Sequence, residues 1–364
     1  MQETVPPRTA HEPSRIATLF PGYFALVMAT GIVAIAAELR GFGSIAAVLL
    51  VIAAIAYVVL WGLTGARLVR YPGRILADLT SHQRGAGFLT IVAGTNVLGS
   101  AFLVTGGADP AVWRRTTAEV LWFVGLALWV GLLYAFVVAV TIDREKPSLD
   151  AGIGGVWLLL VVSTESVAVL GARVSVLLHA DWVVFTALAT FCIGAMFYIV
   201  IIGLIFYRWT FFPMGSLQLT PPYWINMGAL AIATLAGSLL LQLAPASALI
   251  AAVQPFIAGM TVLFWAFATW WIPILIAVGF WRHVMQRVPL SYDPQYWAMV
   301  FPLGMYATCT AVMLAAFRSV LGVDLSFLSW VSPLFFWVAL ASWVVVCVAM
   351  VASLWPSRVA AATA

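Results

Sequence analysis

The sequence has 364 residues, of which 64% are hydrophobic and only 8% are charged, and its mean hydropathy is +1.08. Because a soluble domain carries roughly 25% charged residues, the composition excludes a soluble globular protein and indicates an all-α integral membrane protein. Basic residues exceed acidic ones by 17 to 13, but most of the excess is arginine in loops, so nucleic acid is not expected as a partner.

From the N-terminus, residues 1–15 are rich in proline and polar residues, and we expect a disordered cytoplasmic tail. They lack the basic region and cleavable apolar stretch of a signal peptide. Ten segments then have the roughly 20 apolar residues that a membrane span needs. These segments are 16–39, 44–65, 85–106, 117–141, 153–177, 181–207, 221–243, 247–280, 295–317 and 329–354. We expect residues 16–354 to form one ten-helix transmembrane domain and 355–364 a cytoplasmic tail.

The basic residues predict the orientation of these spans. If the two chain ends and the loops after even-numbered spans lie on one side, that side holds twelve of the 17 lysines and arginines. The positive-inside rule then places both termini in the cytoplasm. We therefore expect a multi-pass protein of the cell's inner (plasma) membrane.

Polar residues gather in the odd-numbered spans. Since polar side chains in a membrane normally face the bundle interior or a water-filled cavity, the odd spans are predicted to form an inner ring and the even spans an outer ring. That arrangement is five helical hairpins around a central pore. Close helix packing is the alternative explanation for small residues, but it accounts poorly for the asparagine and the glutamate. The polar and small positions are Thr30, Gly31, Asn96, Ser100, Glu165, Asn226 and Thr308.

The ninth span contains the pair Phe301-Pro302. A proline inside a helix removes one backbone donor and frees the carbonyl four residues earlier, here that of Ala298. In a membrane such a group is tolerated where it borders a water-filled path, and exposed helix N-termini favour anions. No lysine, arginine or histidine lies deep in a predicted span, so backbone dipoles, hydroxyl groups and Asn96 are the polar groups available to line such a path.

The same pair suggests an internal repeat. FPGYFALVMATGIV at 20–33 and FPLGMYATCTAVML at 301–314 both begin with Phe-Pro, continue with small, aromatic and methionine residues, and then reach a threonine. Both lie early in a predicted inner span. The match predicts a repeated hairpin unit.

Three segments carry a resemblance to a known family. LFPGYFALVMATGIVAIA (19–36), RGAGFLTIVAGTNVLGS (84–100) and YDPQYWAMVFPLGMYAT (292–308) resemble the tellurite-resistance/dicarboxylate transporter family. That family includes slow anion channels, bacterial tellurite-resistance proteins, malate permeases and sulfite efflux pumps. The resemblance implies ten helices in five hairpins around a central pore, often as a homotrimer in the lipid membrane, and transport of small inorganic or organic anions.

The resemblance also implies a pore blocked by a phenylalanine on the ninth helix, and Phe301 is the matching position. Trp297 and Met305 lie on the same helix face and are the alternatives. A core or lipid-facing aromatic is the commoner role of such a residue. The residues expected to line the pore are Thr30, Gly31, Asn96, Ser100, Glu165, Asn226, Pro302, Met305 and Thr308.

Glu165 leaves a second transport mechanism open. It is the only acidic residue well inside a predicted span, and the cost of burying a charge favours its protonated form. It is either a proton-coupling group, as in a proton-coupled C4-dicarboxylate or malate carrier, or a hydrogen-bonded structural acid. The family contains both channels and proton-coupled carriers.

An enzyme is not expected. The sequence has no HExxH or GxSxG motif, no histidine deep in a predicted span and three scattered cysteines, so no nucleophile–base or metal constellation is evident. The loop segment from Asp78 through His82 to Arg84 is interpreted as capping the third span, not as a catalytic site. No cofactor or metal is expected, and a retinal-type receptor is disfavoured because the only lysine, Lys146, lies in a loop.

Overall fold

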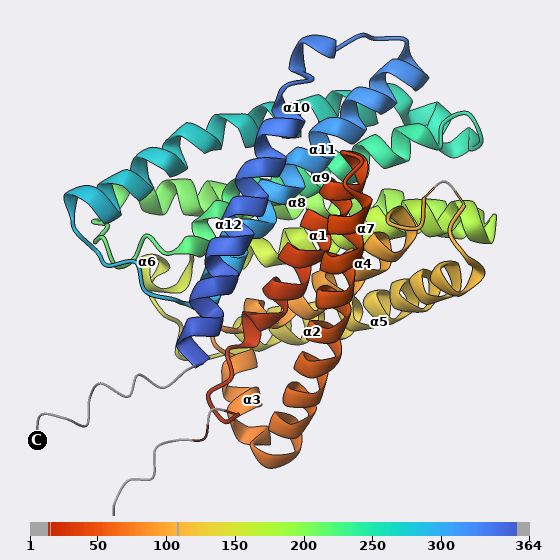
Figure 1. Cartoon of the computed structure of the whole chain (residues 1–364). Helices are drawn as coiled ribbons and strands as arrows, with labels where there is room; N and C mark the ends of the chain where they lie inside the picture. Colours follow the sequence, from red (N-terminus) through yellow and green to blue (C-terminus); the bar gives the residue numbers. More distant parts are fainter. Residues whose placement is uncertain (1–13, 15, 108, 355–364) are drawn as a thin grey trace, which may run out of the picture.

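The computed structural model describes residues 14, 16–107 and 109–354 of the chain. Within these residues, ten helices are long and apolar enough to cross a membrane, and each matches one predicted segment. The protein is an all-α integral membrane protein, as the sequence predicts. Figure 1 shows the long helices packed as one bundle, with the short helix α3 projecting beyond one end.

The spans alternate between inner and outer helices. The inner helices are α1 (Ala25–Leu39), α4 (Leu89–Val104), α7 (Leu159–Leu178), α9 (Ile225–Gln242) and α11 (Trp297–Leu321). The outer helices are α2 (Gly43–Arg70), α5 (Val112–Ile142), α8 (Asp181–Phe211), α10 (Ala248–Phe280) and α12 (Val331–Leu354). Two short helices, α3 (Pro72–Leu79) and α6 (Leu149–Gly152), lie in connections at the end where the first span begins.

Burial separates the two sets. Between 83% and 94% of the residues in the most apolar stretch of each inner span are buried, against 17% to 44% in each outer span. Inner helices are covered on all sides by protein, whereas outer helices leave one apolar side exposed. The predicted inner and outer rings are confirmed, with one helix of each kind per hairpin.

Every inner span starts with a tight 3₁₀ turn before its α-helix. The turns are Pro21–Phe24, Gly85–Phe88, Gly155–Leu158, Pro221–Trp224 and Pro294–Tyr296. Proline suits three of these starts, because its ring presets the backbone angle and the first helical turn has no use for its missing N–H. The five turns give a common origin from which equivalent positions on the inner helices can be counted.

This origin corrects the repeat inferred from the sequence. Pro21 begins the first inner span, but Pro302 lies inside α11, and α11 remains helical across it. The structural counterpart of Pro21 is Pro294, which begins the 3₁₀ turn of the ninth span. A repeated hairpin unit is present, but the Phe-Pro pairs placed it in the wrong register.

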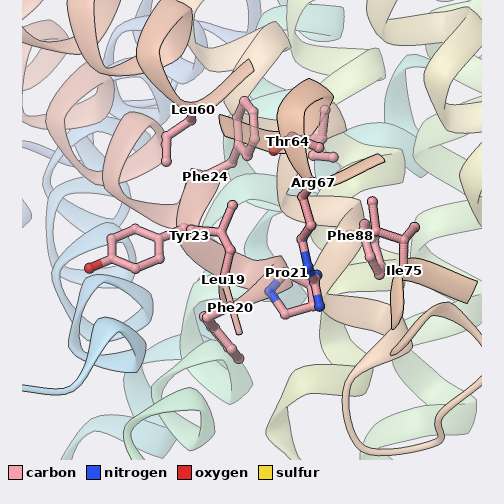
Figure 2. Close-up of a pocket in the computed structure, with 11 residues that line it drawn as sticks. Leu19, Phe20, Pro21, Tyr23, Phe24, Leu60, Thr64, Arg67, Ile75 and Phe88 are labelled. Atoms are coloured by element: carbon pink, nitrogen blue, oxygen red, sulfur yellow. The ribbon is translucent and has the colours of Figure 1, made fainter. Parts of the chain in front are cut away.

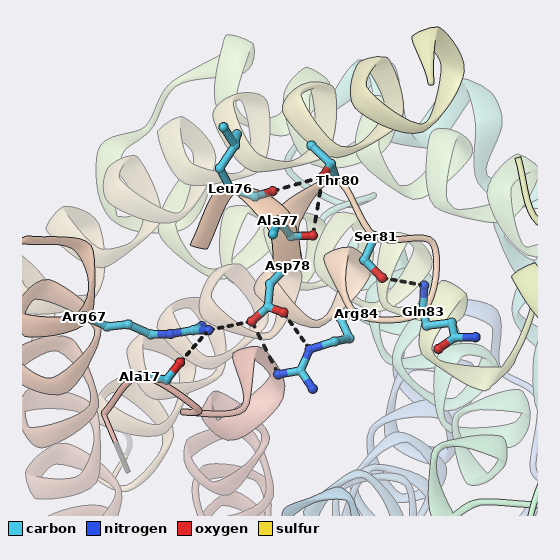
Figure 3. Close-up of polar contacts among 9 residues, drawn as sticks. All are labelled: Ala17, Arg67, Leu76, Ala77, Asp78, Thr80, Ser81, Gln83 and Arg84. Carbon is cyan, nitrogen blue, oxygen red and sulfur yellow. Dashed lines mark hydrogen bonds and ion pairs between the residues drawn. The ribbon is translucent and has the colours of Figure 1, made fainter. Parts of the chain in front are cut away.

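An ion-pair cluster ties α3 to the bundle (Figure 3). The Asp78 carboxylate accepts hydrogen bonds from Arg67 at 2.6 Å and pairs with Arg84 at 2.7 Å, and Arg67 also donates to the Ala17 carbonyl. The Arg67 side chain lies beside Pro21 in a small cavity of about 10 Å³ between α2, α3 and the starts of two inner spans (Figure 2). Asp78 therefore holds the loop against the third span, as the capping interpretation expects.

The starts of the inner spans also pack closely against one another. A Cβ added at Gly155 would lie 2.4 Å from the Pro222 carbonyl oxygen, a rigid backbone atom. Only glycine fits this approach between the fifth and seventh spans. Gly203 on the outer helix α8, by contrast, has no atom within 4 Å of an added Cβ.

Gly155→Ala should therefore lower the midpoint of thermal unfolding, because overpacking a tight contact costs about 1–3 kcal/mol. Gly203→Ala is the matched control and should be neutral or stabilising, since alanine is favoured over glycine inside a helix by roughly 0.5–1 kcal/mol. Thermal unfolding of both purified variants in detergent measures the difference. Equal midpoints would contradict the packing described for Gly155.

Candidate functional site

Equivalent positions of the five inner helices form rings around one cavity. Counting eleven residues on from the first residue of each 3₁₀ turn gives the middle ring: Ile32, Asn96, Ser166, Ile232 and Met305. All five members line the same central cavity, whose volume is about 10 Å³. Such a cavity is at the lower limit for one water molecule. The inner helices thus surround an axis that is nearly closed at its middle.

A wide vestibule opens further along this axis. Eighteen residues on from the start of each 3₁₀ turn lies the far ring: Leu39, Leu103, Arg173, Leu239 and Val312. All five line one open cavity of about 760 Å³, the far vestibule. Its place at the C-terminal ends of the inner helices puts it at the end of the bundle away from α3.

A second vestibule lies at the starts of the inner helices. This near vestibule has a volume of about 530 Å³. Arg208 on its wall is buried and donates hydrogen bonds to the Ile153 carbonyl and, at 2.6 Å, to the Tyr223 hydroxyl. Trp157 and Gln295, from the turns that begin the fifth and ninth spans, also line it. Near vestibule, central cavity and far vestibule follow one another along the inner helices.

Phe301 lies in the section between the near vestibule and the central cavity. Seven residues on from the start of each 3₁₀ turn is the Phe301 ring: Met28, Val92, Val162, Gly228 and Phe301. Its members are buried, Phe301 to 1% exposure, and none lines either neighbouring cavity. Phe301 precedes Met305 by one helical turn, so both lie on the face of α11 that borders the axis.

The two alternatives to Phe301 occupy different places. Met305 belongs to the middle ring and lines the central cavity. Trp297 donates a hydrogen bond from its indole to the Tyr292 hydroxyl at 3.3 Å, and its ring lies 6.5 Å from that of Trp343 on the outer helix α12. Phe301 is thus the one of the three in the closed section.

The Pro302 ring on α11 packs against the neighbouring inner helix α9. A Cβ added at Gly228 on α9 would be 2.5 Å from the Pro302 ring, so glycine at this position lets α9 and α11 approach closely. Pro302 lines none of the three cavities on the axis.

Several residues singled out in the sequence border the central cavity or lie beside it. Asn96 lines it and donates from its amide to the Ser166 hydroxyl at 3.1 Å. Ser100 lines it with a hydroxyl oxygen that has no partner among the described residues. Thr308 is buried three residues beyond Met305, also with an unpartnered hydroxyl oxygen. The cavity therefore has a few polar atoms in an otherwise apolar wall.

Four other predicted residues line none of the three cavities. The Thr30 hydroxyl accepts a hydrogen bond from the Trp343 indole of the outer helix α12 at 2.9 Å. Gly31 packs against Val97 of α4. The other two point elsewhere: the Glu165 carboxyl lies against Gly194 of α8, and the Asn226 amide is buried without a partner among the described residues.

The hydrogen bond between Thr30 and Trp343 is one case of a recurring contact between inner and outer helices. The Trp129 indole of α5 donates to the Thr164 hydroxyl at 2.8 Å, and the Trp265 indole of α10 donates to the Thr310 hydroxyl at 3.0 Å. The Tyr57 hydroxyl of α2 bonds to the Thr95 hydroxyl at 2.9 Å. Inner-helix hydroxyl groups thus bind outer helices as well as facing the axis.

Arg173 is the residue that sequence reasoning missed. It lies inside α7, five residues before the end of that helix, where the sequence alone suggests only a basic residue near the end of a span. It lines both the central cavity and the far vestibule. Counting residues from the start of each 3₁₀ turn would have placed Arg173 on the axis. The wrong repeat register concealed this count.

Ten helices in five hairpins, with cavities in series along an inner ring, define a membrane transport protein. The sequence pattern of the voltage-dependent anion channel (SLAC1) family matches residues 18–351. The chain belongs to this family, and small anions are the general class of substrate that its membership supports.

Several known proteins are similar to this chain. An uncharacterized membrane protein of Mycobacterium tuberculosis is 41% identical over 153 residues, which are 42% of this chain and 74% of that protein. Two uncharacterized transporters of Methanocaldococcus jannaschii are 25% and 23% identical, over 83% and 81% of this chain and 86% and 84% of their own lengths. These two similarities extend across most of the ten spans.

Cysteine labelling should report the order of the rings. In a variant lacking Cys192, Cys309 and Cys347, we expect a small water-soluble thiol reagent to modify Val312→Cys quickly and Met305→Cys slowly, because the vestibule is open and the central cavity holds about one water. Rates of modification in the intact membrane measure this order. Thr30→Cys, on a face turned to α12, is the matched control and should not react; reaction as fast as at Val312→Cys would contradict the ring assignment.

Proposed function

We propose that the protein conducts small anions along the axis of its five inner helices and that Phe301 is the gate. The observation that carries this proposal is the position of the Phe301 ring, which closes the path between a vestibule of about 530 Å³ and the central cavity. The pore lining proposed from the sequence is retained for Asn96, Ser100, Met305 and Thr308, which border the central cavity or lie beside it.

The charges along the path support an anion as the substrate. No acidic side chain lines the central cavity or the far vestibule among the described residues, whereas Arg173 lines both. The near vestibule adds little net charge, because Arg84 on its wall is paired with Asp78 and Arg208 is accompanied by Asp150. A low-dielectric wall focuses the field of Arg173 into the path.

The candidate substrates are C4-dicarboxylates, sulfite, tellurite, halides and nitrate. In this proposal both termini lie in the cytoplasm and the protein lies in the inner membrane. The near vestibule then opens to the cytoplasm, and the far vestibule opens to the opposite side of that membrane. The exposed apolar faces of the outer helices suit contact with lipid and with two further copies in a homotrimer.

The gate proposal gains support from the kind of contacts that hold the Phe301 side chain. Its ring makes no stacking or edge contact with another aromatic ring of the described residues, and a phenyl group has no hydrogen bond to lose. Turning the Phe301 ring away from the axis therefore costs apolar contacts but no hydrogen bond and no contact with another aromatic ring.

Phe301→Ala should raise anion flux into liposomes roughly tenfold or more, since removing about 1.4 kcal/mol from a barrier raises a rate tenfold. Chloride- and nitrate-driven flux at equal protein density measures the effect. Phe336→Ala is the matched control, because Phe336 is fully buried but stacks on Phe42 at the periphery of the bundle. Unchanged flux in well-folded Phe301→Ala would reject the gate.

The second candidate function is a proton-coupled C4-dicarboxylate carrier that uses Glu165. One observation favours it: both carboxyl oxygens of Glu165 are buried without a hydrogen-bond partner among the described residues. Against it, the carboxyl lies against Gly194 of α8, whereas the next residue, Ser166, lines the central cavity. We therefore favour the passive conduit.

Glu165→Gln separates the two functions. A conduit should keep its flux, and that flux should be electrogenic and independent of an imposed pH gradient. Malate and chloride uptake into liposomes, with and without a pH gradient, measures this. The coupled carrier would be established instead if the wild type takes up malate uphill when a pH gradient is imposed and Glu165→Gln does not.

A further inference from the structure

We propose that Arg173 and Ser100 form a binding site for small planar oxyanions, of the carboxylate and nitrate class, at the boundary between the central cavity and the far vestibule. This inference rests on the proposed function, because it identifies where a conducted anion is held and which anions are preferred.

The first argument is the position of the charge. Arg173 is the only charged member of the far ring, and the other four are leucine or valine. It also borders the central cavity, which connects it to the narrow part of the axis. An anion entering from the far vestibule meets this guanidinium before it meets the middle ring.

The second argument is the absence of a protein partner. Arg173 donates no hydrogen bond and forms no ion pair to any described residue, and its buried Nε is unpartnered. Three acidic side chains lie on neighbouring segments, and none pairs with Arg173: Glu165, two turns back on α7, faces α8, Asp109 pairs with Arg115, and the Glu38 carboxylate lies near Gly43 at the start of α2. An ionised side chain inside a membrane protein normally has a partner or a function.

The third argument is the chemistry of the donors. A guanidinium presents a planar set of N–H groups that matches the two oxygens of a carboxylate or nitrate, whereas a spherical halide accepts from it with no such match. Ser100 borders the same central cavity and its hydroxyl has no partner among the described residues. Its O–H is available as a donor to an oxygen that points toward the middle ring.

The size of the space sets the limit on the ligand. The central cavity of about 10 Å³ admits no more than one water-sized group, while the far vestibule of about 760 Å³ is open. A small headgroup can therefore reach the guanidinium from the vestibule side, with at most one oxygen directed toward Ser100. Larger organic anions would bind through a terminal carboxylate, with the remainder in the vestibule.

The test is equilibrium binding to the full-length protein in detergent, with sodium nitrate, formate and chloride as the probes. Nitrate and formate should raise the midpoint of thermal unfolding saturably, by about 2–4 °C at high occupancy, and chloride by less. Arg173→Gln should abolish the shift. Arg173→Lys keeps the charge but loses the planar donor set, so it should bind nitrate and chloride about equally.

Arg40→Gln is the matched control: it removes one positive charge from an exposed position at the same end of the bundle and should keep the full nitrate shift. An unchanged shift in Arg173→Gln, or a chloride shift as large as that of nitrate in the wild type, would overturn the site. If Arg173→Gln fails to fold, equal nitrate preference in Arg173→Lys and the wild type overturns it as well.

Flux through liposomes distinguishes this site from the conduit itself. A wild type that binds nitrate but moves no anion would refute the conduit and leave the site standing. If the wild type conducts anions and Arg173→Gln retains both the nitrate shift and the nitrate-to-chloride flux ratio, the site is refuted and the conduit still stands. Arg173→Gln should instead lower that ratio severalfold.

Discussion

The structure depends on the common level at which its five inner helices begin. In hydrocarbon every backbone polar group needs a partner within the protein. A tight 3₁₀ turn begins each inner span and fixes where its α-helix starts. Glycines such as Gly155 then allow the starts to pack against each other directly. Because the starts coincide, residues at equal distances from each start lie at the same height. The axis is therefore lined by successive rings of five residues, one from each inner helix.

The ring arrangement also explains how much the sequence could predict. Hydropathy, together with the concentration of polar residues in odd spans, was sufficient for the ten helices and the two layers, because both follow from length and burial. Individual side-chain directions were harder. Hydroxyl groups of inner helices serve two surfaces, and the Thr30 hydroxyl accepts from an outer tryptophan while that of Ser100 faces the central cavity. Composition alone does not separate these cases.

Arg173 shows the same limit for charges. Near the end of a span, an arginine is ordinarily explained by snorkelling toward the membrane surface. Only the register set by the 3₁₀ turns reveals that this one belongs to the far ring. The Phe-Pro pairs obscured that register, since they begin one inner helix at Pro21 but fall two turns inside another at Pro302.

The bonds between the two layers have a consequence for speed. Tryptophan and tyrosine side chains of four outer helices (α2, α5, α10 and α12) form hydrogen bonds with hydroxyl groups of inner helices. Helices tied in this way are poorly suited to the rigid-body rocking of a carrier, which takes microseconds to milliseconds. The bonds between the layers therefore favour opening by side-chain movement within the inner ring, as the gate proposal requires, over movement of whole helices.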